Sequence, residues 1–386
     1  MHTYLLGAGA IGGLFAAHLA SKVPVTVLLR PSRLPDFAGV LRIRAQHDPA
    51  APLLEARVRA EAVPPPAASS SRTPPQQHQQ HQQQPRPGEA HIPALILATK
   101  ANQALPALSA LRSRLDARSV VVLLQNGVLG VHEQVCQDLF PHPDQRPAFI
   151  LGSTTHGAYR QAGDPFSIVH AGLGTCVFGE PAGSTPHSAS SAGGDSSRSS
   201  SGSAGASNTG SQHHHHHQQQ QQQQQSVQAV MQTLASLSML QPTVNIPPDQ
   251  LQRLLLLKLV VNCCANPLSA LLHCKNGGLM NNGAAAHAWT RIIAECKHVL
   301  GPRLPDSAEG LFDHVSRIVG LNAQNYNSML QDAAHHRPTE IDYLNGYVVQ
   351  HARRQGLAAP WNEVLCSLVA AREQAAADTL TTETLA

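Results

Sequence analysis

The chain has 386 residues, with 27 Lys and Arg against 24 Asp and Glu, so its formal net charge is only +3 when the histidines are neutral. No basic cluster accompanies the 4% of aromatic residues, which argues against nucleic-acid binding. No uninterrupted apolar run approaches the ~20 residues that cross a bilayer, and the first apolar segment lacks the basic region of a secretory signal. The 7 cysteines form no C-x-x-C pair, which is typical of reduced thiols in a cytoplasmic protein.

The N-terminal half alternates short apolar runs with helical patterns, as β-α-β units around a parallel sheet do. Strands are expected at Thr3–Leu6, Val25–Leu29, Val40–Ala45, Ala94–Ala98, Ser119–Leu124, Phe149–Ser153, Ser167–His170 and Thr175–Phe178. Helices are expected at Ala10–Ala20 and Gln103–Leu115. This order predicts an α/β domain of the doubly wound Rossmann type over residues 1–180.

Two segments contain almost nothing to bury. Residues 62–93 and 181–226 consist largely of Pro, Ser, Gly, Gln and His. Such segments cannot offset the conformational entropy lost on ordering, so we expect both to be disordered surface inserts. The second contains His213–His217, but a histidine run without fixed geometry is not expected to form a functional metal site.

After Ile246 the pattern becomes helical almost throughout. Helices are expected at Pro248–Leu272, Ala284–Leu300, Ser307–Gln331, Glu340–Arg354 and Trp361–Ala377. We therefore expect residues 227–246 to complete the first domain or link it to the second. Residues 247–386 are then predicted to form an all-α domain.

The first predicted strand runs directly into a glycine-rich turn. The turn fits G-x-G-x-x-G and opens the first predicted helix; its residues are Gly7, Ala8, Gly9, Ala10, Ile11 and Gly12. Glycines at these positions allow a tight turn, close approach of a pyrophosphate and close helix–strand packing. The helix N-terminus adds N–H groups and partial positive charge, so the context predicts a dinucleotide site.

The end of the second predicted strand indicates which dinucleotide is bound. NAD enzymes usually place an acidic residue there, whereas a cation suits the 2′-phosphate of NADP. This chain has Arg30, and its planar guanidinium can bind a phosphate in a fork. Arg30 therefore favours NADP(H), with a solvated surface arginine as the alternative.

Polar residues follow two further strands of the predicted sheet. Thr99 and Lys100 follow one strand, and Gln125, Asn126 and Gly127 follow the next. Ligands of α/β domains bind outside the carboxyl ends of strands, so these positions are candidate ligand contacts. Asn-Gly is also a common turn, and loop chemistry alone is the alternative.

One predicted helix carries a polar stripe on an apolar background. Lys258, Asn262 and Asn266 are spaced by four residues, which puts them on one face of the Pro248–Leu272 helix. Burying a lysine costs several kcal/mol unless the group is paired or solvated. The dense apolar neighbours favour a pocket wall over a wet helix face.

A second polar stripe lies further along the chain. Asn325, Ser328 and Asp332 share one face of a predicted helix. Further on, Thr339 is a candidate N-cap with Asp342 at the third helical position, a capping-box-like arrangement. Taken alone, Glu340 is comfortable in the first turn of its own helix, where the helix dipole favours a carboxylate.

These motifs together resemble the ketopantoate reductase (2-dehydropantoate 2-reductase) family. The resemblance rests on GAGAIGG from Gly7, ATKANQ from Ala98, LQNGVLG from Leu124 and STTHGAYR from Ser153. Two longer blocks are highly specific: KLVVNCCANPLSALLHCKNGGL from Lys258 and NSMLQDAAHHRPTEIDYLNG from Asn327. The departures from the family pattern are modest. Leu257 replaces an aromatic residue often found before the lysine, and the two inserts are atypical, but neither change touches a motif residue.

The resemblance implies NADPH-dependent reduction of ketopantoate to (R)-pantoate in pantothenate biosynthesis, with no metal required. It implies that Lys258 is the proton donor. It implies substrate contacts from Asn126, Asn262, Asn266, Asn276 and Ser328. It implies cofactor contacts from Gly7, Ala8, Gly9, Ala10, Ile11, Gly12, Lys100, Asn126, Ala158 and Glu340, to which the strand-end argument above adds Arg30.

Two other functions stay open on the sequence. One is NADPH-dependent reduction of another small 2-keto acid on the same scaffold. The other is an NADPH-sensing protein without turnover, which would require a damaged polar constellation. We expect a monomer or homodimer in the cytoplasm, with a small-molecule substrate and neither nucleic acid nor membrane as a partner.

Overall fold

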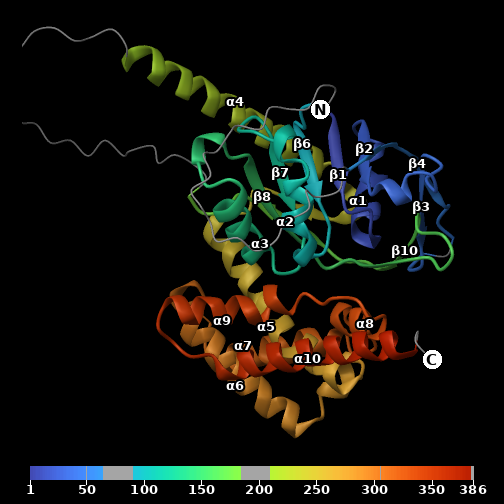
Figure 1. Ribbon diagram of the computed structural model, residues 1–386, viewed down its shortest axis with the longest axis vertical. Helices are drawn as coiled ribbons and strands as arrows, with labels where there is room; N and C mark the ends of the chain where they lie inside the picture. The colour runs from blue at the N-terminus through green and yellow to red at the C-terminus, as the bar shows by residue number, and fades with distance from the viewer. Residues whose placement is uncertain (49, 64–89, 184–208, 305, 384–386) are drawn as a thin grey trace, which may run out of the picture.

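The computed structural model of the chain describes residues 1–48, 50–63, 90–183, 209–304 and 306–383, with the side chains of 209–217 and 377–383 outside that description. An α/β half and a helical half lie one above the other in Figure 1. The predicted combination of a Rossmann-type domain with an all-α domain is confirmed.

An eight-stranded sheet forms the centre of the α/β half. Its strand order is β12 (Pro242–Thr243), β11 (Cys176–Gly179), β8 (Ala148–Thr154), β7 (Val120–Leu123), β6 (Ala94–Leu97), β1 (Thr3–Leu6), β2 (Val25–Leu29) and β5 (Arg59–Ala62). All neighbours pair in parallel except β11 with β8. Leu6 lies level with Leu28 and Leu97, so the residues after β1, β2 and β6 emerge at one edge.

The central strands are buried on both faces because helices cover each of them. Helices α1 (Ala10–Ala20) and α4 (Thr209–Ala235) share one hydrophobic cluster with Leu5 and Val122. Helices α2 (Ala101–Ser109) and α3 (Val128–Gln134) pack with Leu6 and Val121 in another. This alternation explains why these strands are continuous apolar runs.

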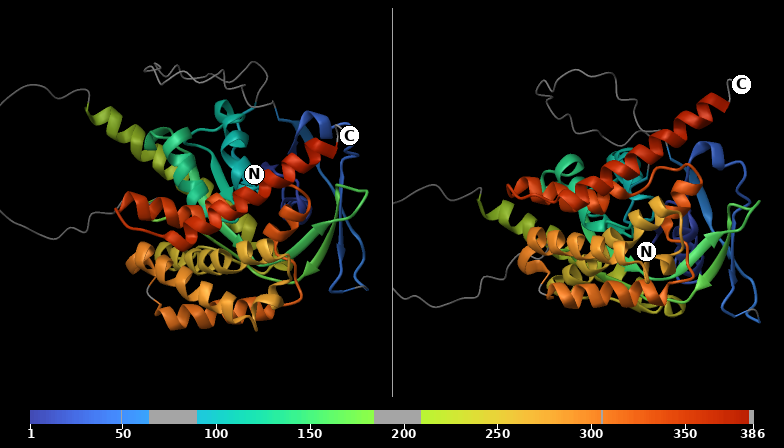
Figure 2. Two further views of the ribbon diagram at one scale, coloured as in Figure 1. Left: turned by 60° about the horizontal axis from the view of Figure 1, so that its bottom comes forward. Right: turned by 90° about the horizontal axis from the view of Figure 1, so that it is seen from below.

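A smaller four-stranded sheet lies to one side of the larger one (Figures 1 and 2). Its order is β4 (Leu54–Arg57), β3 (Val40–Ala45), β10 (Ser167–Gly172) and β9 (Gly157–Arg160). Its apolar residues Ile43 and Ile168 join the same cluster as α1, so α1 is packed between two sheets. The sequence analysis did not identify β4, β5, β9 or β12, which are short or strongly polar.

The helical half contains α5 (Pro248–Leu272), α6 (Gly283–Leu300), α7 (Ala308–Leu321), α8 (Ser328–Ala334), α9 (Asn345–Arg354) and α10 (Pro360–Glu383). Helix α5 connects the two halves. Leu251 and Leu255 in its first turns pack with the α/β half, whereas Leu256 and Leu259 belong to the core of the helical half. Of the helices in the described ranges, α5 alone is long and apolar enough to span a membrane, but 67% of its most apolar window is buried inside the protein. That burial is typical of a core helix.

Several predicted helices have different bounds in the structure, three of them markedly. The Ser307–Gln331 segment is two helices, α7 and α8, and the Asn327 side chain caps the second by accepting from the N–H of Leu330. Helix α9 begins only at Asn345, after a 3₁₀ turn at Ile341–Tyr343, so Thr339 does not cap a long helix. Helix α2 starts at Ala101 and ends at Ser109, and a 3₁₀ turn follows at Arg112–Arg114.

The two segments that we expected to be disordered lie mostly outside the described residues, at 64–89 and 184–208. The rest of the second insert, from residue 209, is the beginning of α4. There the Gln223 side chain donates hydrogen bonds to the carbonyls of Ala117 and Arg146. These contacts with the α/β half correct the expectation of disorder for that part of the insert. The His213–His217 side chains are outside the description.

Candidate active site

The glycine-rich turn fits tightly between β1, β6 and α1. Gly7 has a φ of 101°, and a Cβ at this position would lie 2.5 Å from the backbone nitrogen of Thr99. A Cβ on Gly12 would lie 2.0 Å from the carbonyl oxygen of Gly7. Gly9 differs, because a Cβ there would meet no atom of the described residues within 4 Å. The first and third glycines therefore serve packing, and the middle one faces open space that a ligand can approach.

The start of α1 is suited to an anion. Gly9 is the N-cap and provides no side-chain cap, and the first turn contains no acidic residue. Two buried polar atoms nearby, Oγ1 of Thr99 and Oε1 of Gln125, have no hydrogen-bond partner among the described residues. An uncapped helix N-terminus and unpartnered polar side-chain atoms at one sheet edge fit a dinucleotide with its phosphates at the helix N-terminus.

Arg30 lies immediately after β2 at the same edge. Its side chain is exposed, and Nη2 donates to Oε1 of Gln103 at 3.3 Å. The structure thus keeps this predicted cation beside the glycine turn with its guanidinium accessible. Gln103 was not identified as a site residue from the sequence.

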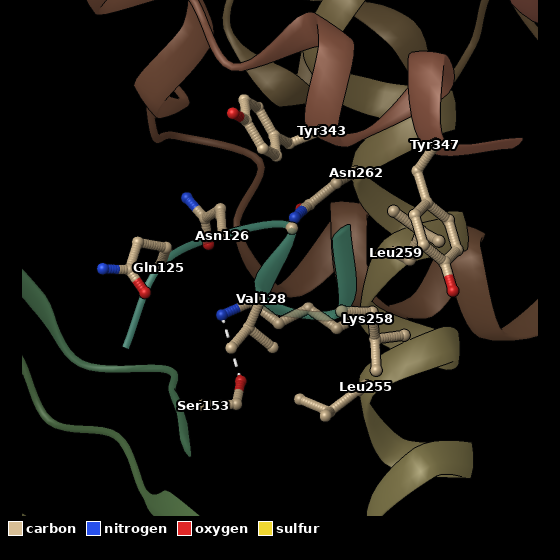
Figure 3. Close-up of a pocket in the computed structure, with 12 residues that line it drawn as sticks. Gln125, Asn126, Val128, Ser153, Leu255, Lys258, Leu259, Asn262, Tyr343 and Tyr347 are labelled. Carbon is tan, nitrogen blue, oxygen red and sulfur yellow. Dashed lines mark hydrogen bonds between the residues drawn. The ribbon is translucent and has the colours of Figure 1, made fainter. Parts of the chain in front are cut away.

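Lys258 projects from α5 toward the end of β8 (Figure 3). Its Nζ donates to Oγ of Ser153 at 3.1 Å and to the carbonyl oxygen of Thr154 at 3.0 Å. Burial lowers the pKa of Lys258 to about 8, against the opposing attraction of the Glu340 carboxylate. Both partners of Nζ are neutral, so among the described residues the ammonium is held without an ion pair in direct contact.

A narrow pocket opens beside this ammonium, between the two halves. Figure 3 shows Asn126 from the α/β half and Asn262 from α5 on its wall. The other lining residues are Gln125, Gly127, Val128, Leu129, Ser153, Leu255, Leu259, Tyr343 and Tyr347. One cation and three side-chain amides, those of Gln125, Asn126 and Asn262, meet in a pocket whose other lining residues are mostly aliphatic or aromatic. That is the usual composition of a small-molecule site.

Charged groups close one side of this region. The Glu340 carboxylate accepts from the backbone N–H of Ala101 at 2.8 Å and from Nδ2 of Asn126 at 3.3 Å. Lys100 donates to the buried Asp332 at 2.6 Å, and its Nζ lies 3.9 Å from Glu340. The predicted cofactor residues Lys100, Asn126 and Glu340 therefore form one cluster across the two halves.

Other predicted residues lie away from the pocket lining. Asn266 is buried one helical turn beyond Asn262, and Ser328 is the first residue of α8. The Asn276 side chain accepts from Asn327 at 3.0 Å and donates to the carbonyl of Asn322 at 3.2 Å. Ala158 lies on β9 and packs against the α1 cluster. Ligand contacts by these four residues stay predictions.

The sequence analysis missed the direct partners of Lys258. Ser153 and Thr154 are the last residues of β8, at the same sheet edge as the other strand-end candidates. The rule that selected Lys100 and Asn126 applies equally to them. Tyr343 and Tyr347 were also missed, because an aromatic residue in a helical pattern is indistinguishable from a core residue.

Family models and curated relatives agree on one family. Residues 3–183 match the model described as ketopantoate reductase PanE/ApbA, and residues 250–373 match the model of its C-terminal domain. A 2-dehydropantoate 2-reductase of Vibrio cholerae is 27% identical over 97% of this chain and 98% of its own length. A Schizosaccharomyces pombe protein named probable 2-dehydropantoate 2-reductase is 27% identical over 96% and 95%.

Solved structures share the fold. That of a probable 2-dehydropantoate 2-reductase from Bacillus subtilis has a TM-score of 0.64 at 22% identity, covering 96% of this chain and all of its own. The complex of D-mandelate dehydrogenase with NADH has a TM-score of 0.67 at 19% identity, with 97% and 99% coverage. At these identities the likeness establishes the arrangement of the chain only.

Proposed function

The chain belongs to the ketopantoate reductase family, and from this premise we propose that it reduces the C2 ketone of 2-dehydropantoate to the alcohol of (R)-pantoate with NADPH. The observation that carries the proposal is the Lys258 ammonium at the pocket between the two halves, held by Ser153 and Thr154. The product would serve pantothenate biosynthesis.

The proposed role of Lys258 follows from the charge that develops during reduction. When bound, the reduced nicotinamide supplies the hydride that C2 accepts. The former carbonyl oxygen then gains negative charge and needs a proton. An ammonium stabilises that charge and donates the proton, which leaves a neutral lysine.

The hydrogen bonds of Lys258 prepare it for this role. An ammonium has three N–H donors, and two of them point to Oγ of Ser153 and the carbonyl of Thr154. We propose that the third is directed at the substrate oxygen. A pKa of about 8 makes the group both protonated near neutral pH and a stronger acid than an exposed lysine.

Neutral groups are proposed to bind the rest of the substrate. Ketopantoate carries a carboxylate and a primary hydroxyl besides its ketone. The amides of Asn126 and Asn262 line the pocket, and we assign further substrate contacts to Asn266, Asn276 and Ser328 from the family resemblance. Amides and hydroxyls can hold the carboxylate without neutralising the ammonium.

NADPH is proposed as the cofactor, bound across the sheet edge. The turn from Gly7 to Gly12 offers an open approach and an uncapped helix N-terminus for the pyrophosphate. Arg30 is available for the 2′-phosphate. Lys100, Asn126, Ala158 and Glu340 are assigned to the remaining cofactor contacts.

The proposal is tested by following NADPH absorbance with ketopantoate as the substrate. We expect ketopantoate-dependent oxidation of NADPH, a higher kcat/KM than with other 2-keto acids, and a preference for NADPH over NADH. A higher kcat/KM with another small 2-keto acid would transfer the assignment to that substrate. Binding of NADPH without turnover on any of them would favour a sensing protein.

A further inference from the structure

His156 is a buried titratable residue that the proposed chemistry does not use. It follows the strand that ends with the two partners of Lys258, and only 6% of it is exposed. Its backbone N–H donates to Oγ1 of Thr154 at 3.2 Å, and both ring nitrogens have hydrogen-bond partners.

The partners of the ring define its tautomer. Nε2 lies 2.9 Å from the carbonyl oxygen of Leu240, so Nε2 must carry the hydrogen. Nδ1 is then the acceptor, and it receives the backbone N–H of Gly174 at 3.0 Å. Nε2 of His170 also lies 2.9 Å from this Nδ1. The donor at Nε2 and the acceptor at Nδ1 together define the Nε2–H tautomer of the ring.

The ring therefore joins segments that are distant in the chain. Leu240 follows α4, His170 lies on β10, and Gly174 lies between β10 and β11. A Cβ on Gly174 would lie 2.5 Å from the backbone nitrogen of His156, so the loop at Gly174 packs directly against the residues that follow β8. Thr155 adds a reciprocal pair of bonds with Thr175.

We propose that His156 is a positioning residue that fixes the end of strand β8, where Ser153 and Thr154 hold the Lys258 ammonium. The inference rests on the proposed function, because it concerns the placement of the proposed proton donor. The end of β8 presents Oγ of Ser153 and the carbonyl of Thr154 to Nζ. Without the anchored ring, both acceptors shift, and the ammonium loses its alignment with the substrate oxygen.

The test compares His156→Ala with His47→Ala. His47 packs its ring against His170 and contacts the carbonyl of His170, but it has no bond to residues 153–156 among those of the described chain. Both variants lose one imidazole from the same cluster. We expect His156→Ala to lower kcat about 10–100-fold with unchanged NADPH affinity, since small misplacements of reacting groups have effects of this size. His47→Ala should keep kcat within about twofold.

A double-mutant comparison separates positioning from general damage. In a Lys258→Ala background, His156→Ala should cause no further loss of kcat, because the group that it positions is already absent. An equal fold-loss in both backgrounds, or a kcat for His156→Ala that matches His47→Ala, would overturn the inference. Full ketopantoate reduction by Lys258→Ala would instead contradict the proposed function, so the two failures are distinguishable.

If His156→Ala does not fold, two larger variants replace it. Asn at this position places its oxygen near the site of Nδ1, where it can accept from Gly174. Gln extends to the site of Nε2 and bonds Leu240 instead. We expect His156→Asn to retain more kcat than His156→Gln, because the bond to Gly174 lies beside the residues that directly follow β8. Equal kcat values would overturn the proposal.

Discussion

The Glu340 carboxylate accepts a hydrogen bond of 2.8 Å from the backbone N–H of Ala101, although the two residues belong to different halves of the molecule. Ala101 is the first residue of α2, whose N-cap, Lys100, provides no side-chain acceptor. The carboxylate therefore occupies the positive end of that helix. Glu340 thus connects the helical half to the sheet edge and also acts electrostatically on Lys258.

Glu340→Gln should lower the pKa of Lys258. The carboxylate attracts the ammonium and raises its pKa, so a neutral amide that can still accept from Ala101 removes this effect. We expect the alkaline fall of kcat to move to lower pH. Asp342→Asn is the control, because Asp342 is exposed and does not contribute to the pKa of Lys258. An alkaline limb that stays in place in Glu340→Gln would exclude this electrostatic role.

Lys258→Ala should retain NADPH binding and lose turnover. Removing a positioned general acid typically costs about 10²–10⁴-fold in rate, or about 3–5 kcal/mol of barrier. The measurement is kcat with ketopantoate beside the Kd for NADPH from fluorescence titration. An unchanged kcat would remove Lys258 from the mechanism.

The wild-type kcat should fall as the pH rises through about 8. Only the protonated lysine can donate, and the ammonium form disappears above its pKa, which burial sets at about 8. Lys258→Arg tests the assignment, since a guanidinium stays charged over this range and does not give up its proton. The variant should be slow with no alkaline limb. A limb that persists in Lys258→Arg would belong to another group.

Local patterns led to the right helix face at Lys258 but not to its partners. The spacing of Lys258, Asn262 and Asn266 is set by the helical period, which depends only on neighbours in the chain. Asn262 indeed faces the same pocket as Lys258. Ser153 and Thr154 are distant in sequence, and only knowledge of which strand ends meet the helix identifies them.

Glu340 illustrates the limit of local reasoning more sharply. Its position after Thr339 favoured a role in the first turn of its own helix, yet the structure uses its charge at the start of α2 in the other half. The break between α7 and α8 does have a local sequence signal. Residues 322–327 are rich in Asn, whose side chain competes for backbone hydrogen bonds. Pairing across halves has no comparable local signal.

Arg30→Ala should weaken NADPH much more than NADH. A charge-assisted bond to the 2′-phosphate contributes roughly 1.5–3 kcal/mol, which is about 10–100-fold in Kd, and NADH lacks this group. Lys22→Ala provides the control for general loss of surface charge, because Lys22 is exposed at the other end of α1. Equal losses for the two cofactors would mean that the 2′-phosphate is held elsewhere.

Gly127→Ala should destabilise the protein and impair catalysis, because the two halves meet at this residue. Gly127 has a φ of 67°, and an added Cβ would lie 2.4 Å from the carbonyl oxygen of Tyr343. The left-handed backbone costs about 1–2 kcal/mol for a residue with a Cβ, and overpacking adds roughly 1–3 kcal/mol.

Gly163→Ala separates these two contributions. Gly163 has a φ of 81°, but within the described part of the chain a Cβ there would meet nothing inside 4 Å, so only the backbone cost applies. Urea unfolding should therefore show a larger loss of stability for Gly127→Ala than for Gly163→Ala. The kcat should fall only in Gly127→Ala, since moving Tyr343 away also displaces the neighbouring Asn126 from the pocket. Equal destabilisation with normal kcat in both would show that the halves can separate at Gly127 without disturbing the site.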